Sequence, residues 1–269
     1  MTVALEVRDL HVRYPAPDGT VVHAVQGIDL HISRGERFAL VGESGCGKTT
    51  SALALMGLLP RRAEVEGELL LNGSPLPRGG DDVWRAHRWC EIAIVFQGAM
   101  SSLNPVKRIA AQVAEPLVAH GLMERREARE RAVELLEVVG IPARRMGAFP
   151  HELSGGMRQR TAIAMALACK PTALIADEPT TALDTMVQAQ IFELLVRLGE
   201  ELNLALLLVT HDLPVVMRYC DRAAVMRAGR IVETAPVTDL YARPGHPYTR
   251  QLLEASPDRS RRRDREDAA

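Results

Sequence analysis

Hydrophobic and polar residues alternate over residues 1–35 in the manner of exposed strands, and the run from Pro15 to Gly19 supplies a turn between them. Apolar runs predict further strands at 37–41, 69–73, 92–96, 172–176 and 204–210. Two short apolar segments around Ala228 and Gly229 predict a hairpin. Residues 60–68 and 74–82 lack such a pattern and are expected to be loops.

From about residue 98 to residue 167 the pattern changes to that of helices. The charged run 124–131 leads into an apolar face with helical spacing that ends at Gly140. We interpret the charges as a solvated helix face with i,i+4 pairs rather than as a partner-binding patch. Another long helix is predicted over 184–202. Apolar strands that alternate with helices predict a doubly wound α/β core.

Composition narrows the class of protein. The 269 residues carry 33 basic and 34 acidic side chains, a net charge of −1, so we expect no nucleic-acid partner. The four cysteines stand far apart in sequence, which predicts a reducing compartment and neither a zinc site nor a disulfide framework. The N-terminus does not resemble a signal peptide, and the apolar run 202–209 is shorter than the roughly 20 residues that span a bilayer. The charged or small residues 257–269 are expected to be disordered.

Residues 42–49 match the phosphate-loop pattern G-x-x-x-x-G-K-[ST], between a predicted strand and a predicted helix start. The glycines let backbone N–H groups curl around an anion, and the helix dipole adds partial positive charge there. We expect Lys48 to reach the terminal phosphates of a triphosphate and the Thr49 hydroxyl to bind Mg²⁺. The expected nucleotide-binding residues of this segment are Gly42, Glu43, Ser44, Gly45, Cys46, Gly47, Lys48, Thr49 and Thr50.

Polar side chains directly follow three other predicted strands. Asp177 would hold Mg²⁺, and Glu178 would accept a proton from the attacking water. Alone, these two carboxylates could equally mark a strand that ends at the surface. The Gln97 amide could bind Mg²⁺ or orient a water, and the His211 imidazole could hydrogen-bond a γ-phosphate, although a lone histidine is more often structural.

A second anion-binding helix start is predicted at Leu153-Ser154-Gly155-Gly156, ahead of a helix rich in Ala and Met. An ordinary helix cap would explain Ser154 and one glycine. It would not explain a second phosphate-binding surface beside a complete first one.

With these residues in view, residues 3–250 resemble the ATP-binding subunits of ABC transporters. The resemblance implies a P-loop NTPase (RecA-like) α/β core, an antiparallel β subdomain and an inserted α-helical subdomain. The phosphate loop corresponds to Walker A, 153–156 to the ABC signature, 173–180 to Walker B and 182–184 to the D-loop. Gln97 corresponds to the Q-loop and His211 to the switch histidine. The implied ranges are 1–97 and 168–240 for the core with its β subdomain, 98–167 for the helical subdomain and 241–269 for a C-terminal extension.

The same resemblance implies ATP and Mg²⁺ as cofactors and a head-to-tail dimer of nucleotide-binding subunits. In such a dimer Ser154, Gly155, Gly156 and Asp184 would act in trans on the ATP of the partner. Tyr14 is the candidate for stacking on adenine, or else it is a strand aromatic that packs locally.

A narrower resemblance, to the dipeptide, oligopeptide and nickel importer ATPases, rests on residues 96–105, 150–160 and 243–249. It implies a second, different ATP-binding subunit, two permease subunits, a substrate-binding protein and a place on the cytoplasmic face of the membrane. Two departures stand out. Gly98 occupies a position that is commonly acidic, and the chain lacks the cysteine-bearing extension of many peptide importers, so no iron–sulfur cluster is expected.

Peptide is the leading solute, with nickel or another small solute as the alternative. A soluble ABC protein that acts on DNA or ribosomes and an inactive regulatory cassette are the other readings of the motifs. For a transporter, we expect the helical insertion to dock a permease loop. The apolar residues expected there are Met100, Leu103, Val106 and Ile109, unless they fill the small core of the insertion itself.

Overall fold

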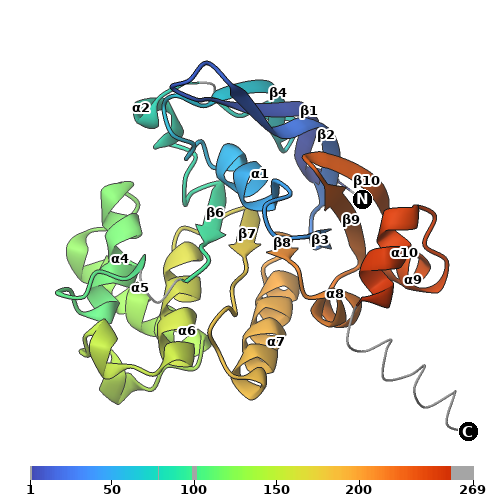
Figure 1. Ribbon diagram of the computed structural model, residues 1–269. Helices are drawn as coiled ribbons and strands as arrows, with labels where there is room; N and C mark the ends of the chain where they lie inside the picture. The colour runs from blue at the N-terminus through green and yellow to red at the C-terminus, as the bar shows by residue number, and fades with distance from the viewer. Residues whose placement is uncertain (1, 78, 99–101, 256–269) are drawn as a thin grey trace, which may run out of the picture. The chain divides into compact units, whose positions relative to one another are not determined.

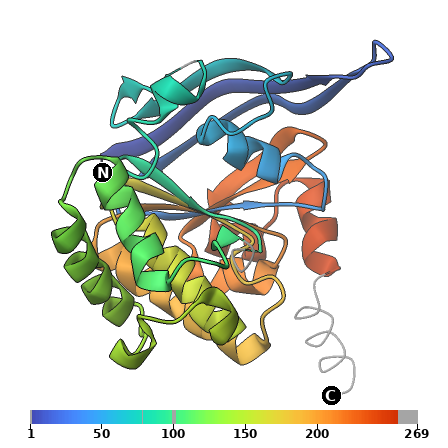
Figure 2. The ribbon, with the colours of Figure 1, turned by 90° about the vertical axis from the view of Figure 1, so that its left-hand side faces the viewer.

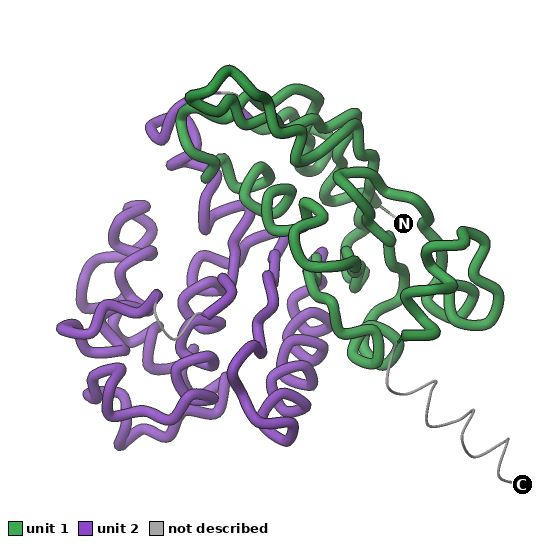
Figure 3. Tube along the Cα trace, viewed as in Figure 1, with its two compact units in different colours: residues 1–76, 207–269 green, residues 77–206 purple. Residues whose placement is uncertain are grey.

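The computed structural model describes residues 2–77, 79–98 and 102–255. The predicted disordered tail, 257–269, lies outside this range. The chain divides into two compact units, coloured separately in Figure 3. Unit 1 comprises residues 1–76 and 207–269, and unit 2 comprises residues 77–206. The subdomain ranges derived from the family resemblance stay predictions.

Unit 1 contains a four-stranded antiparallel sheet with the order β2-β1-β4-β5. Its strands are β1 (Val3–Pro15), β2 (Val21–Ser33), β4 (Glu64–Leu71) and β5 (Ser74–Pro75). The predicted alternation is confirmed, since Leu5, Val7 and Leu10 are buried while Glu6, Arg8 and Asp9 reach solvent. Strands β1 and β2 form a long ribbon, and the predicted turn lies at its end (Figure 2).

The expectation of a loop over 60–68 is wrong in its second half, because β4 begins at Glu64. This segment has few strand-forming residues of its own and is held by its partner strand. Arg13 of β1 forms a two-pronged ion pair with Glu66, at 2.7 and 3.0 Å. Gly67 passes so close to β1 that a Cβ there would lie 2.4 Å from the Asp9 carbonyl oxygen. The expected loop at 74–82 likewise contains β5 and the short helix α2 (Asp81–Trp84).

The rest of unit 1 is built on neighbouring strands in the order β10-β9-β3-β8. These strands are β3 (Arg37–Val41), β8 (Ala205–Thr210), β9 (Arg222–Arg227) and β10 (Arg230–Pro236), and the boundary between the units falls within β8. The accompanying helices are α1 (Lys48–Leu55), α8 (Leu213–Tyr219), α9 (Val237–Ala242) and α10 (Pro247–Glu254). Strands β9 and β10 form the predicted hairpin, with Ala228 and Gly229 both at positive φ, as a tight turn between antiparallel strands requires.

Unit 2 pairs β6 (Ile92–Val95) in parallel with β7 (Ala173–Asp177), and every residue of β7 is buried. Its long helices, seen in Figure 1, are α4 (Ile109–Ala119), α5 (Arg125–Val138), α6 (Gly155–Ala166) and α7 (Thr185–Glu201). Short 3-10 helices lie at Ala143–Arg145 and Pro150–Glu152. The helical character predicted for 98–167 and the long helix predicted over 184–202 are confirmed.

The charged run at the start of α5 faces solvent, as expected. Exposed ion pairs link Arg126 to Glu130 at 3.3 Å and Arg131 to Glu134 at 2.7 Å, whereas Ala128, Ala132, Leu135 and Leu136 are buried. Pairs of this kind contribute only about 0.3–0.5 kcal/mol each. Packing of the apolar face therefore holds α5 in place.

Candidate functional site

The phosphate loop, residues 42–49, connects β3 to α1 in unit 1. Gly47 has φ 110° and is the N-cap of α1, and no acidic residue lies in the first turn of that helix. The positive end of the helix dipole is therefore not neutralised by a neighbouring carboxylate. The glycines are also required sterically. A Cβ on Gly42 would lie 2.2 Å from the Met226 carbonyl oxygen, and one on Gly47 would lie 2.4 Å from the Ala24 carbonyl oxygen.

Lys48 is 5% exposed, and its ammonium is held by the loop itself. Nζ donates to the carbonyl oxygens of Gly42 and Glu43, each at 2.8 Å. A buried ammonium is costly without such partners. The loop backbone thus surrounds the Lys48 ammonium, which is positioned to bind a phosphate. Thr49 follows at the helix start and is exposed.

The β9–β10 hairpin is linked to this loop by a backbone hydrogen bond. The Gly229 N–H donates to the Cys46 carbonyl at 2.9 Å, and the Gln26 N–H donates to the Gly229 carbonyl at 2.8 Å. These contacts could not be predicted from the sequence, because Gly229 and the phosphate loop are about 180 residues apart. Two further predicted residues of unit 1, Tyr14 and His211, lie on β1 and directly after β8; Tyr14 is half-buried and His211 is exposed.

In unit 2, the structure brings two predicted residues into direct contact. Gln97 follows β6, Glu178 follows β7, and the Gln97 amide Nε2 donates to Glu178 Oε2 at 2.9 Å. Thr181, which sequence reasoning missed, donates its hydroxyl to the same oxygen at 3.1 Å. Asp177, the last residue of β7, is 2% exposed. Glu178 has φ 42°, an unusual backbone conformation for a glutamate, which often marks a functional position.

Gly98 follows Gln97 with φ 67°. Glycine enters the left-handed region without steric cost, whereas an acidic side chain there would be less favourable. The backbone conformation at position 98 therefore favours glycine over the acidic residue that is common at this position.

The signature segment, residues 153–156, starts helix α6. Ser154 is its N-cap and is exposed, and its Oγ accepts from the Met157 N–H at 3.3 Å. Asp184 caps α7 in the same way, accepting from the Val187 N–H at 3.0 Å. The two helix starts meet at Gly156, where a Cβ would lie 2.6 Å from Val187 Cγ1. The close approach of the signature segment to the first turn of α7 thus favours glycine at position 156.

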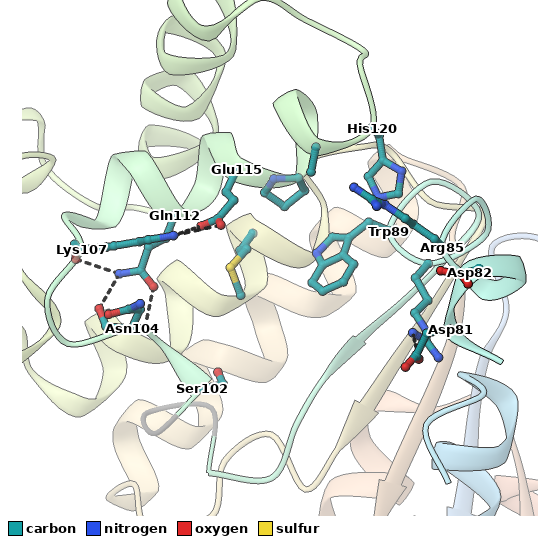
Figure 4. Close-up of a pocket in the computed structure, with 14 residues that line it drawn as sticks. Asp81, Asp82, Arg85, Trp89, Ser102, Asn104, Lys107, Gln112, Glu115 and His120 are labelled. Carbon is teal, nitrogen blue, oxygen red and sulfur yellow. Dashed lines mark hydrogen bonds and ion pairs between the residues drawn. The ribbon is translucent and has the colours of Figure 1, made fainter. Parts of the chain in front are cut away.

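Unit 2 also contains a pocket of about 560 Å³. Its residues come from α2 and the segment after it, from the segment 102–107, and from α4 and α6: Asp81, Asp82, Arg85, Arg88, Trp89, Ser102, Asn104, Lys107, Gln112, Glu115, Pro116, Ala119, His120 and Met165. In Figure 4 the Trp89 ring stands between the Lys107 side and the Arg85 side of this pocket.

One wall of the pocket is fixed by the buried amide of Gln112. Its Nε2 donates to the carbonyls of Asn104 and Lys107, and its Oε1 accepts from the Asn104 N–H. Lys107 and Glu115 pair at 2.9 Å on the same side (Figure 4). On the other side, burial together with the charge of Arg85 lowers the pKa of His120.

The predicted apolar docking patch is wrong in its composition. Leu103 is 3% exposed and Ile109 is fully buried, so both fill the core of the helical insertion. Val106 is 79% exposed, and Met100 lies outside the described residues. Leu103 and Ile109 therefore cannot contribute to a docking surface on this insertion.

All four cysteines are free thiols. Cys90 and Cys169 are far apart in sequence but lie close together in the structure, and burial together with the neighbouring Cys90 raises the pKa of Cys169 to about 12. Among the described residues no group of three His, Cys, Asp or Glu side chains could hold a metal ion by itself. Within the same residues, no helix has the length and apolar character needed to cross a membrane.

Comparison with known proteins assigns this chain to a family. The family model described as "ABC transporter" matches residues 25–181. The probable peptide ABC transporter ATP-binding protein y4tR of Sinorhizobium fredii is 49% identical, over 96% of this chain and 78% of that protein. The oligopeptide transport ATP-binding protein OppD of Bacillus subtilis is 46% identical, over 96% of this chain and 73% of that protein.

Solved structures of ABC transporter cassettes support the same family assignment. The dimeric structure of MJ0796, a bacterial ABC transporter cassette, superimposes with a TM-score of 0.76 and 30% identity, over 87% of this chain and 98% of that one. A post-hydrolysis structure of MJ0796 bound to ADP and Pi gives the same values. The predicted P-loop NTPase fold is confirmed. The chain belongs to the ABC transporter family.

Proposed function

We propose that this chain is the ATP-hydrolysing subunit of an importer for di- or oligopeptides. The observation that carries the proposal is that relatives named for peptide and oligopeptide transport match 96% of the chain at 49% and 46% identity. The complete set of expected motif residues agrees with an active ATPase. The structure of MJ0796 with ADP and Pi shows that a cassette of this fold can retain hydrolysis products.

Within one subunit, the phosphate loop would bind the triphosphate through its backbone N–H groups, Lys48 and the start of α1. The ammonium of Lys48 already lies inside the loop, so binding exchanges carbonyl partners for phosphate oxygens. Tyr14 would stack on the base, and His211 would contact the γ-phosphate.

Mg²⁺ would be held by oxygen donors. The Asp177 carboxylate, the Thr49 hydroxyl and the Gln97 amide oxygen are all hard ligands of the kind that this ion prefers. When bound, the ion would offset the charge of the β- and γ-phosphates. Glu178 would then take the proton of the attacking water, and the Gln97 and Thr181 donors hold its carboxylate in one orientation.

A second ATP-binding subunit would complete the site. Ser154 accepts from the Met157 N–H and keeps its own O–H as a donor, which suits it to a phosphate of the partner's ATP. Gly155 and Gly156 add backbone N–H groups at the helix start, and Asp184 lies at the adjoining start of α7. We infer that these four residues act in trans.

Two permease subunits would hold the chain at the cytoplasmic face of the membrane and receive solute from a substrate-binding protein. The pocket of unit 2 is the proposed contact for a permease loop, in place of the apolar patch. Its mixed lining, with Trp89 between charged side chains, fits an amphipathic segment.

Cross-linking tests this contact. A cysteine at Ala119, which is exposed and lines the pocket, should cross-link to permease loops in the assembled transporter. A cysteine at Leu122, 52% exposed but outside the lining, is the control. Equal cross-linking at both positions would argue against the pocket as the contact site for a permease loop.

The solute is tested by reconstituting the ATPase subunits with the permeases and binding protein encoded beside them. Di- and oligopeptides should stimulate ATP hydrolysis when the binding protein is present, and Ni²⁺ should not. Stimulation by Ni²⁺ alone would replace peptide by nickel as the solute.

A further inference from the structure

The loop between β7 and α7 (Figure 1), residues 178–184, contains two residues in an unfavourable backbone conformation. Glu178 has φ 42° and Ala182 has φ 67°, so both lie in the left-handed region although neither is glycine. Residues with a Cβ adopt this conformation only where the surrounding structure enforces it. Contacts with the rest of unit 2 must therefore hold the loop in this form.

One such contact comes from Gln188, near the start of α7. Its side-chain Nε2 donates to the Thr180 carbonyl oxygen at 3.2 Å, and the Leu183 N–H donates to the same oxygen at 3.1 Å. Thr180 is only 9% exposed, so water competes little for these bonds. Gln188 is itself half-buried on a helix of 17 residues whose apolar face is buried. The loop is thus held by a side chain from a rigid element.

The hydrogen bond from Gln188 fixes the orientation of one peptide group. The Thr180 carbonyl and the Thr181 N–H belong to the same planar unit. While Gln188 holds its oxygen, its N–H donates to the Glu178 carbonyl oxygen at 3.3 Å. The plane of this peptide sets the direction of the Thr181 side chain, whose hydroxyl donates to Glu178 Oε2 at 3.1 Å. One peptide group and one side chain therefore connect Gln188 to the Glu178 carboxylate.

We propose that Gln188 is a positioning residue for ATP hydrolysis. It holds the peptide between Thr180 and Thr181, and through the Thr181 hydroxyl it keeps the Glu178 carboxylate in one orientation. A base that is already oriented toward its water loses less free energy in reaching the transition state. This inference rests on the proposed role of Glu178 as the base.

The first test is Gln188→Met, which keeps a long side chain with good helix propensity and removes the amide donor. Gln251→Met, at an exposed position of α10, is the matched control. Three quantities are measured on the full chain with the partner subunit present: kcat from phosphate release, MgATP affinity from calorimetry, and the melting temperature.

Gln188→Met should lower kcat about 2–10-fold, as loss of one hydrogen bond predicts, and should leave MgATP affinity unchanged. A glutamine that only stabilised the fold would lower the melting temperature without this selective loss of kcat. Gln251→Met should match the unchanged protein. If Gln188→Met retains the original kcat, the inference is wrong.

A double-mutant cycle tests the connection through Thr181. Thr181→Ala alone should slow hydrolysis, because it removes one donor to Glu178 Oε2. Adding Gln188→Met should then slow hydrolysis little further, since the connection is already broken. Two independent losses that multiply in the double variant would contradict the inference.

Glycine at position 182 tests whether hydrolysis needs the loop to be held. Ala182→Gly removes a steric cost and should raise the melting temperature by roughly 2–4 °C, while the greater freedom of the loop should lower kcat. Lys170→Gly is the control, because Lys170 also has a positive φ, 55°, and is exposed outside the loop. It should raise the melting temperature and leave kcat unchanged. Full kcat in Ala182→Gly would count against the inference.

Glu178→Gln separates this inference from the proposed function. If Glu178→Gln is nearly inactive while Gln188→Met hydrolyses ATP normally, only the role of Gln188 is lost. If Glu178→Gln hydrolyses ATP at the original rate, the proposed base is wrong and the inference falls with it.

Discussion

The Gln97 amide and the Glu178 carboxylate, 81 residues apart, are joined by a hydrogen bond of 2.9 Å. They follow the parallel neighbours β6 and β7, whose carboxyl ends lie at the same edge of the pair. The Gln97 N–H and the Thr181 O–H both donate to Oε2, which restricts rotation of the carboxylate. A general base works best in a fixed orientation, so this contact supports the proposed role of Glu178.

Glu178→Gln should bind MgATP and hydrolyse it about 10²–10⁴ times more slowly, because the amide keeps the shape of the side chain and cannot take a proton. Its carbonyl oxygen can still accept from Gln97 and Thr181. Binding is measured by calorimetry and turnover by phosphate release, with the partner subunit present. Hydrolysis at the original rate would remove Glu178 from the mechanism.

Lys48→Ala should act at the binding step. The substitution removes a cation that the loop carbonyls already hold in place, so ATP affinity and turnover should both fall. Calorimetry at low salt gives the affinity. Lys170, which is not part of the phosphate loop, serves as the matched control through Lys170→Ala. Undiminished ATP binding by Lys48→Ala would contradict the assignment.

Elements with a strong local pattern were predictable from sequence. Strand β7 is apolar up to its last residue, Asp177, and is buried throughout. Helix α7 begins directly after Asp184, where the helix was predicted to start, and its apolar face is buried. The phosphate loop was predictable because its backbone conformation requires glycine at fixed positions, such as Gly47 with φ 110°.

Features that depend on distant partners were not predictable. The start of β4 is set by Arg13 and the passage of Gly67 over β1. The Cys90–Cys169 pair likewise joins distant segments. The predicted docking patch was wrong because an apolar residue such as Ile109 carries no local sign of whether it faces a partner or its own core.

Cys220 should make stability fall at alkaline pH. Burial, with the charge of Asp221, raises the pKa of its thiol from 9.0 to about 12, against the opposing charge of Arg37. Below pH 9 the thiol is protonated in both the folded and unfolded chain. Between pH 9 and 12 only the unfolded chain loses the proton, so the free energy of unfolding falls by roughly 1 kcal/mol per pH unit. Cys220→Ala lacks this group and should show a shallower decline in urea titrations. Parallel curves for the two proteins would contradict the prediction.

Gly156→Ala should disturb the contact between the signature segment and α7. The new methyl group would lie 2.6 Å from Val187 Cγ1, and a β-branched side chain that is stiff at χ1 cannot turn away easily. Overpacking of this kind costs about 1–3 kcal/mol. We therefore expect a lower melting temperature and reduced ATP hydrolysis with the partner subunit.

A second substitution distinguishes this steric effect from a loss of the glycine itself. Val187→Ala creates room for the methyl group, so the double variant should recover most of the stability lost by Gly156→Ala. Gly199→Ala on α7 is the matched control, because a Cβ there meets nothing within 4 Å and alanine favours the helix by roughly 0.5–1 kcal/mol. If the double variant regains stability but not hydrolysis, the Gly156 backbone has a role of its own at the partner's nucleotide. If it regains neither, the contact with Val187 is not what requires glycine at this position.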